Sequence, residues 1–485
     1  MRLSPLFKFS LRRLVLAVAF GLPCVAMAAD ATTAQILERL DKLEKSQAAA
    51  DAELKNKDIR IRELEAQLQH SSGAAVSDSA VPDEKYYGDF TPGGAGFRVA
   101  NTKYGALNLS VYSYLRYLNQ SGLDDSYVDG NGNAQSLDKR NDIQIQKVLL
   151  YFKGWVYDPN LRYVFYTWTS NTSQGDSAQV VVAGYLRYAF DKTFNLAAGI
   201  GGLPNTRSME GQWPSFLKVD YRTITDEYFR GSYTTGIFAD GELAEGLQYK
   251  VMLGNNLSQL GVSGSQLDDG LNTVAGALWW MPTTGEFGPG QGFGDYEFHE
   301  NLATRIGVHY SESRETAQSQ PGSDITENTQ IRTSDGRSLF SPGSYAAGVD
   351  VDKARYRMST LDAGMKYRGY ALEGEYFMRW IDDIKANGAL PFSNLTDQGF
   401  QLQASMMAVP KTLQFYLSGS KIMGEYGDPY DIALGGNWYP YKEVRSLRVN
   451  AELMQLSHSP VGYTSVPFAV GGNGLVFTTH VELAF

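Results

Sequence analysis

The 485-residue sequence has almost no cysteine and little histidine. One cysteine excludes a scaffold held together by disulfides, and five scattered histidines argue against a histidine-rich metal site. Basic residues are outnumbered by acidic ones, 43 to 53, and the formal charge of −10 excludes a basic nucleic-acid-binding protein. Beyond the N-terminus there is no run of about 18 apolar residues, which excludes a protein built from membrane-spanning helices.

Glycine and aromatic residues are abundant instead. The chain has 50 glycines and 30 tyrosines. Only 20% of the residues are charged, yet the mean hydropathy is −0.29, so the chain as a whole is polar. This combination is typical of an all-β protein whose strands, rather than helices, cross a membrane.

Residues 1–28 have the organisation of a secretory signal peptide. Four basic residues precede an apolar stretch at 14–23, and Ala26 and Ala28 provide small residues at a cleavage site. The apolar stretch is too short to span a bilayer of about 30 Å as a helix. We therefore expect cleavage after Ala28, which also removes Cys24, the one cysteine.

Residues 29–70 are predicted to form a coiled coil, because apolar residues recur in alternating steps of three and four over nearly five heptads. An amphipathic helix lying on the rest of its own chain is the alternative, and the pattern does not separate a dimer from a trimer. Residues 71–98 are rich in Ser, Gly, Ala, Pro and Asp, and we interpret them as a flexible linker. The apolar residues expected to make the oligomerisation contacts are Ile36, Leu40, Leu43, Leu54, Ile61, Leu64 and Leu68.

From residue 99 to 485 apolar and polar residues alternate in segments of about eight to eleven residues. One segment, for example, places Leu413, Phe415 and Leu417 on one face and polar residues on the other. Charges recur along the polar face, which suits a water-filled lumen with lipid outside. The segment lengths predict a transmembrane antiparallel β-barrel of 16 strands, with 18 as the alternative, large enough to leave an aqueous channel.

The last segment ends the chain on an aromatic residue. Phe477, Val481, Leu483 and Phe485 fall on one face of an alternating strand. Together with the signal peptide, this terminal strand looks like the signal read by the outer-membrane barrel-assembly machinery. It points to a bacterial outer-membrane location, with the coiled coil in the periplasm.

Three stretches, Gln146–Gly154, 199–256 and Ala371–Tyr376, resemble the phosphate-selective porin O and P family. The resemblance implies a trimeric, 16-stranded outer-membrane channel with an inward-folded loop that narrows the pore. It also implies phosphate selectivity through an adjacent arginine pair and an arginine ladder. Here Gln146 and Lys147 occupy the positions of the pair. Neither side chain has the guanidinium group with which an arginine binds phosphate through two parallel hydrogen bonds.

The remaining selectivity candidates lie on expected inward faces or near residues 311–352. This stretch lacks alternation, and it is either a loop folded into the lumen or an extracellular loop. Residues 129–133 resemble the start of a calcium-binding loop but lack its later glycine and glutamate, so we interpret them as an ordinary loop. The pore-lining and selectivity candidates are Lys147, Arg332, Arg337, Lys366, Arg368, Glu373, Glu375 and Arg379.

The sequence thus predicts a porin that passes small hydrophilic solutes, anionic ones included, by passive diffusion. We expect no enzyme activity and no cofactor or metal. The expected partners are outer-membrane lipid and lipopolysaccharide, further copies in a homotrimer, and the barrel-assembly machinery, but no nucleic acid. The alternatives are a channel specific for phosphate or another anion, a structural envelope protein and a barrel hydrolase.

Overall fold

The computed structural model divides the chain into two compact units, 1–80 and 81–485, and the described residues belong to the second. The expected signal peptide, the coiled coil and most of the linker therefore lie outside the description. Among the described residues, no helix is long and apolar enough to cross a membrane. The structure describes residues 90–91, 96–170, 179–211, 215–259, 262, 266, 270–288, 292–320, 331–441, 446–462 and 466–485.

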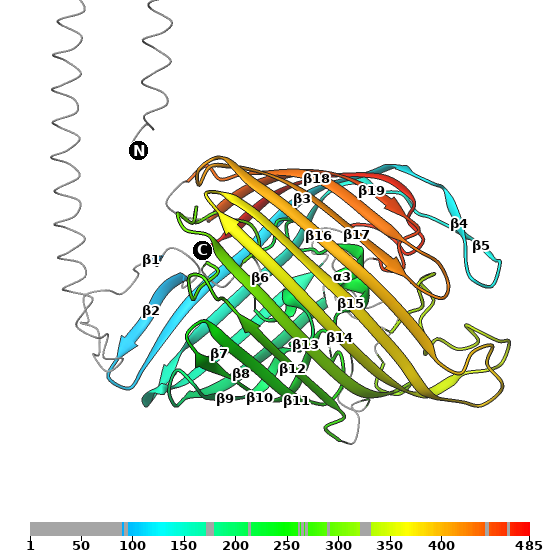
Figure 1. Cartoon of the computed structure of the whole chain (residues 1–485), viewed down its shortest axis with the longest axis horizontal. Coiled ribbons are helices and arrows are strands. Elements are labelled where there is room, and N and C mark those ends of the chain that lie inside the picture. Colours follow the sequence, from blue (N-terminus) through cyan, green and yellow to red (C-terminus); the bar gives the residue numbers. More distant parts are fainter. Residues whose placement is uncertain are drawn as a thin grey trace, which may run out of the picture. The chain divides into compact units, whose positions relative to one another are not determined.

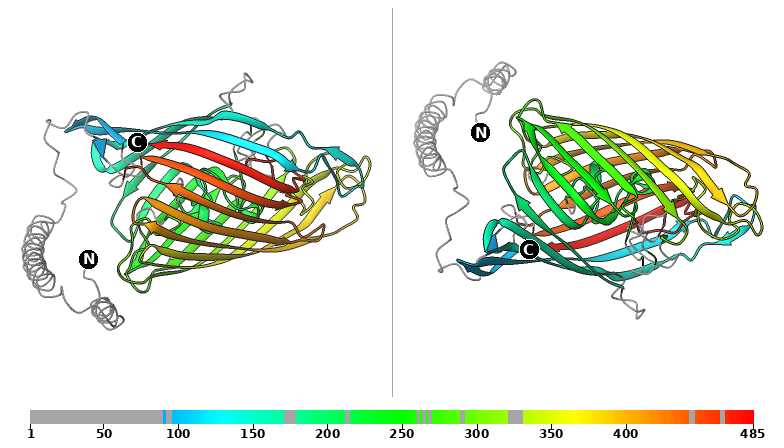
Figure 2. Two further views of the ribbon diagram at one scale, coloured as in Figure 1. Left: turned by 90° about the horizontal axis from the view of Figure 1, so that it is seen from above. Right: turned by 90° about the horizontal axis from the view of Figure 1, so that it is seen from below.

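Sixteen antiparallel strands close into a ring. Figures 1 and 2 show the strands tilted around this ring. They are β3 (Gly105–Leu123), β6 (Asn141–Val156), β7 (Asp158–Ser170), β8 (Gln179–Ala189), β9 (Asn195–Gly202), β10 (Tyr233–Ala244), β11 (Leu247–Gly254), β12 (Thr273–Trp280), β13 (Ala303–Thr316), β14 (Val351–Tyr367), β15 (Tyr370–Ala386), β16 (Leu395–Val409), β17 (Leu413–Met423), β18 (Tyr430–Trp438), β19 (Leu447–Ser457) and β20 (Gly474–Ala484). The prediction of a 16-stranded barrel is confirmed.

The ring closes where the last strand, β20, pairs with the first, β3. Val481 lies opposite Leu115 in this seam. Phe485 and Val111 exchange two backbone hydrogen bonds at its end, of 2.5 and 2.9 Å. The sheet as a whole contains 18 strands because β1 (Phe90–Thr91) and β2 (Gly96–Thr102) continue along the edge of β3, but these two do not belong to the ring.

The strands alternate between an apolar outer face and a polar inner face, as the sequence predicted. On β17, Phe415 and Leu417 are about half exposed on the outside, while Gln414, Tyr416 and Ser418 are buried inside. Burying such an outer face in hydrocarbon is favourable, and closing the ring leaves no unpaired strand edge in the lipid. A polar interior is then left for water and for the segments that fold into it.

At one end of the ring, which we call the turn end, most connections are short, with the connection between β12 and β13 as the long exception; longer connections gather at the opposite loop end. At the turn end, β14 and β15 are joined through Arg368 and Gly369, both with positive φ. At the loop end, the short strands β4 (Ser126–Val128) and β5 (Ala134–Ser136) form a hairpin of their own.

The connection between β9 and β10, residues 203–232, folds into the ring, and we call it the inner loop. It carries a short 3-10 helix, η2 (Arg207–Met209), and a one-and-a-half-turn helix, α3 (Ile224–Phe229). Helix α3 contacts β16, β17 and β18, which lie across the lumen from β9 and β10 (Figure 1). Phe229 of α3 stacks on Phe377 of β15 at 5.2 Å, so the loop is anchored on the far wall.

The stretch 311–352, expected to be one long loop, is shorter than that. Its first residues belong to β13 and its last to β14, and the described parts between them are residues 317–320 and 331–350. Leu339 is fully buried in a cluster with Ile331 and Phe468 from the β19–β20 connection. The connection that reaches across the lumen to the far wall is thus the inner loop, a segment that the sequence analysis did not single out as a constriction.

Candidate functional site

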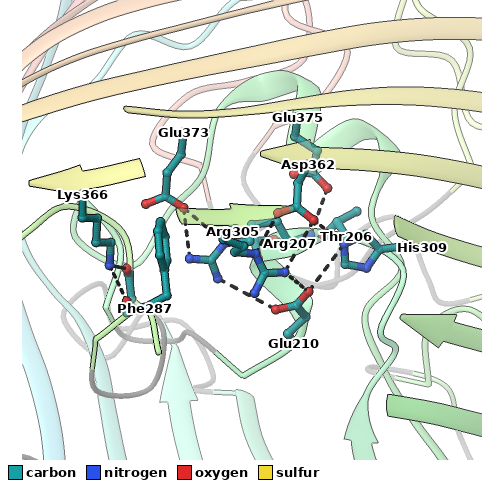
Figure 3. Close-up of polar contacts among 12 residues, drawn as sticks. Thr206, Arg207, Glu210, Phe287, Arg305, His309, Asp362, Lys366, Glu373 and Glu375 are labelled. Carbon is teal, nitrogen blue, oxygen red and sulfur yellow. Dashed lines mark hydrogen bonds and ion pairs between the residues drawn. The ribbon is translucent and has the colours of Figure 1, made fainter. Parts of the chain in front are cut away.

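The first half of the inner loop is fastened to the inner faces of β13, β14 and β15 (Figure 3). Its Arg207 guanidinium lies 3.0 Å from Glu373, and the Arg207 backbone N–H donates to Glu375 at 2.9 Å. All three residues are almost completely buried. The pairing satisfies charges that would otherwise be costly to hold away from water.

A second group of charges surrounds Arg305 of β13. Its guanidinium donates to Asp362 at 2.7 Å and also to Glu210 of the inner loop. His309 contacts the same Asp362 carboxylate at 3.0 Å through Nε2. The ligand-type atoms of Glu210, His309 and Asp362 lie within 4.8 Å of one another. Arg305 already supplies positive charge at this point, so the group acts as a clamp between loop and wall.

The second half of the inner loop pairs its charges mostly within itself. Arg230 makes a two-pronged contact with Glu227, at 2.6 and 2.8 Å, and Arg222 lies 3.8 Å from Asp226. Burial raises the pKa of Asp226 and lowers that of Arg222, while their mutual attraction opposes both changes. The inner loop has four basic residues (Arg207, Lys218, Arg222 and Arg230) and four acidic residues (Glu210, Asp220, Asp226 and Glu227), and so carries no net charge.

Four of the expected selectivity residues lie on inward faces, but the inner loop covers them. Lys147 forms a buried ion pair of 2.8 Å with Asp220. Glu373 and Glu375 hold Arg207, as described above. Arg379 is 1% exposed and contacts Asp397 of β16 and Tyr228 of α3. These side chains therefore position the inner loop rather than face open water.

The other four candidates lie nearer the ends of the barrel. Lys366 faces inward at the turn end, where it donates to the carbonyls of Phe287 and Gly292 at 2.7 and 2.5 Å. Arg368 was expected on an inward face, and this is wrong. It occupies the β14–β15 turn, is exposed, and its backbone N–H bonds to a neighbouring connection, because the strand has already ended at Tyr367.

Arg332 and Arg337 belong to the connection at the loop end. Arg337 donates to Asp335 at 2.7 Å and lies over the rings of Tyr345 and Tyr426, at 4.6 and 4.8 Å. Arg332 donates to the carbonyl of Gly336, and burial lowers its pKa. Both arginines help to fold this connection over the mouth of the barrel.

An open cavity of about 710 Å³ lies on the opposite side of the inner loop, between residues 208–211 and the wall formed by β6–β12. It begins at the turn end, where residues 192 and 285–288 line it, and rises to the level of Tyr166 and Tyr185. Volumes of this size are typical of sites for small molecules. Within the described chain, this cavity is the candidate solute pathway.

Sequence reasoning missed the residues that line this cavity. Many of them lie at inward positions of β6–β12. Sequence alternation assigns these positions to the lumen but does not show which of them contact a solute. The wall contains one two-pronged ion pair, Arg187 with Asp240 at 2.7 and 2.8 Å. It also contains Lys250, whose ammonium lies 5.9 Å from the Phe238 ring and makes no ion pair with the described residues. The aromatic part of the wall includes Tyr151, Tyr166, Tyr185 and Tyr233, together with Phe238, Tyr249 and Trp279.

The calcium-like stretch at 129–133 is the tip of the β4–β5 hairpin. The Asp129 carboxylate accepts the backbone N–H groups of Asn131 and Asn133 and the side-chain amide of Gln135, at 2.9 to 3.0 Å. These donors lower the pKa of Asp129. They also occupy the oxygens that a cation would need, in agreement with the interpretation as an ordinary loop.

The expected assembly signal lies on the outside of β20, where Phe477, Val481 and Leu483 are 38–44% exposed. The terminal Phe485 makes an edge-to-face contact with Phe97 of β2 at 5.8 Å. The residues expected to form the coiled coil lie outside the described part of the chain.

No protein-family model matches the chain, and no curated protein matches its sequence. Solved structures do resemble it. An anion-selective porin from Comamonas acidovorans superposes with a TM-score of 0.50 at 11% identity, covering 79% of this chain and all of that one. The channel DcaP of Acinetobacter baumannii gives 0.48 at 9% identity, with 81% and 100% coverage. OmpF of Salmonella typhi, in complex with daunomycin, gives 0.46 at 14%, with 80% and 100% coverage.

At these identities the similarity establishes the fold alone. The resemblance to phosphate-selective porins is thus supported as far as the general architecture and no further. The ring of 16 antiparallel strands is thus a fold that this chain shares with the porin from Comamonas acidovorans.

Proposed function

We propose that this chain is a bacterial outer-membrane porin through which small hydrophilic solutes diffuse, with no catalytic step and no cofactor. The observation that carries the proposal is the closed ring with an apolar outside, a polar inside and an open cavity beside the inner loop. The inner loop divides the lumen unequally. It packs on β13–β18 and reaches β6 through the pair of Asp220 with Lys147, but it leaves a cavity between its residues 208–211 and β6–β12. Solutes pass through this cavity.

The proposal includes the surroundings expected from the sequence. The mature chain assembles as a homotrimer in contact with lipid and lipopolysaccharide, after the assembly machinery has recognised its last strand. The coiled coil at residues 29–70 lies in the periplasm and strengthens the trimer. Porins commonly act as trimers, and a helical bundle below three barrels suits that arrangement.

A channel specific for phosphate or another small anion is the second candidate. Lys250 favours it, because its ammonium borders the cavity without an ion pair among the described residues. The arginines of the inner loop do not favour it, since each has an acidic partner. Charges neutralised in this way attract a passing anion weakly.

Recording from the purified full-length protein in a planar lipid bilayer tests the proposal. We expect stable ion conductance, a small reversal potential in a salt gradient, and little change of current when inorganic phosphate is added. A large anion-selective reversal potential with phosphate block would instead establish the specific channel. Absence of any conductance from correctly folded, heat-modifiable protein would contradict both.

A further inference from the structure

The cavity has two chemically different sides. On the strand side, Tyr151, Tyr166 and Tyr185 project from the adjacent strands β6, β7 and β8, with Tyr233 of β10 beside them. We call these four residues the tyrosine wall. On the other side lie residues 208–211 of the inner loop, whose Glu210 is already paired with Arg305. A solute in the cavity therefore meets aromatic rings on one side and a neutralised polar strip on the other.

The rings of the tyrosine wall are held in place by their neighbours. Tyr166 stacks on Trp168 with centroids 5.6 Å apart and an interplanar angle of 15°, and it contacts Tyr151 at 5.1 Å. Tyr185 meets Phe238 edge to face at 5.3 Å. Ring faces fixed in this way form a preorganised surface, so little side-chain entropy is lost when a solute packs on them.

Three hydroxyl groups of this wall are available to a solute. Those of Tyr166, Tyr185 and Tyr233 make no hydrogen bond with any residue that the structure describes, and they border the cavity. By contrast, the hydroxyl of Tyr114, which lies outside the wall, donates to Asp220 at 3.0 Å. A tyrosine hydroxyl both donates and accepts, so the three groups match a solute that carries several hydroxyls.

The charged groups in the cavity reinforce this chemistry. Arg187 and Asp240 neutralise each other through two hydrogen bonds, yet each side chain keeps about a quarter of its surface exposed. Together they offer donors and acceptors side by side without net charge. Recognition of a neutral hydroxylated compound uses such pairs. The cavity presents no ring of like charges to a charged solute, because Lys192 and Lys250 line it together with Glu242 and Glu286.

We propose that the tyrosine wall is a binding site for small neutral sugars in the pore of this channel. The inference rests on the proposed function and adds a solute class to it. The C–H face of a saturated sugar ring packs on an aromatic ring, while the hydroxyls at its rim bond to the tyrosine hydroxyls and to Arg187 and Asp240. A cavity of about 710 Å³ accommodates a mono- or disaccharide with its hydration water.

Sugar block of single-channel current tests this site, with maltose as the probe. The linear hexitol sorbitol is the control solute, because it carries hydroxyls but no ring face. We expect concentration-dependent block by maltose, little block by sorbitol, and a weaker effect of inorganic phosphate than of maltose. Equal effects of maltose and sorbitol, or no maltose block in a conducting channel, would overturn the sugar site and leave the porin proposal standing.

Variants locate the site. Y166F, Y185F and Y233F keep the rings and remove the hydroxyls, and each should lower the association constant for maltose about fivefold with little change in open conductance. Y370F is the matched control, because Tyr370 is 63% exposed on the outer face. Unchanged maltose binding in all three cavity variants would overturn the site. A correctly folded wild-type protein that does not conduct would instead contradict the proposed function itself.

Discussion

Several lysine and arginine side chains inside this barrel contact acidic partners at short range, and the pair between Lys147 and Asp220 is a simple case. The two atoms are 2.8 Å apart and both side chains are at most 6% exposed. Asp220 has a positive φ of 62°, a conformation that Asp and Asn tolerate better than most residues. Removing one partner leaves a buried charge without compensation, whereas removing both leaves none.

From this pair follows a prediction about stability. The single variant K147M should destabilise the folded barrel by about 3–5 kcal/mol, and the double variant K147M/D220N by clearly less. The asparagine still accepts the hydroxyl of Tyr114, which bonds to Asp220 in the native protein. Urea unfolding of the purified proteins in detergent measures both values. If the free energy of unfolding lost in the double variant equals the sum of the losses in the two single variants, the two charges do not stabilise each other.

At the level of elements, the inner loop decides which charged residues face solutes. Arg379 and Lys250 both lie on inward faces of strands, but α3 covers Arg379 while Lys250 borders the cavity. Sequence alternation assigns both to the lumen and gives no reason to separate them. The separation comes from where the inner loop packs.

Substitutions of Lys250 and of Arg379 should therefore have different effects on ion permeation. K250M should lower the anion-to-cation permeability ratio about twofold at 0.1 M salt, where charges act over about 10 Å. R379M should leave this ratio unchanged, because its partner Asp397 and α3 lie away from the cavity. It should instead loosen α3 and make the current noisier. Reversal potentials and current noise in a bilayer measure both, and a shifted ratio in R379M alone would contradict the placement of the inner loop.

The strands and their orientation were predictable because period-two alternation is written locally in the sequence. The inner loop was not, since its position depends on contacts such as that of Arg207 with Glu373, 166 residues later. Residues 203–232 do show a signal in retrospect: they lack alternation and carry four basic and four acidic residues. Arg368 was misplaced because alternation was continued one residue past the end of β14.

For the molecule as a whole, the seam between β20 and β3 is what turns a sheet into a channel. These are the last and first strands of the ring, so their pairing joins the two ends of the barrel sequence. Leu115 and Val481 are directly opposite in this seam and both face outward, 46% and 40% exposed. Opposite residues on antiparallel strands bring their Cβ atoms within about 4.5–5.5 Å, close to the range that a disulfide bridges.

A cysteine pair at these positions tests both closure and register. The double variant L115C/V481C should form a disulfide under mild oxidation. The described barrel contains no other cysteine, so a disulfide within it joins these two positions. The product should keep a faster gel mobility than the reduced form even after boiling, because the covalent ring stays closed when the strands unfold. The control L115C/L483C places the second cysteine two residues along, about 7–8 Å away, and should cross-link poorly. Efficient cross-linking of the control, with none in the first pair, would show that the register of the seam is shifted by two residues. Such a shift keeps each side chain on its own face of the sheet, so burial alone does not distinguish it from the native register. The cross-linking measurement does distinguish the two.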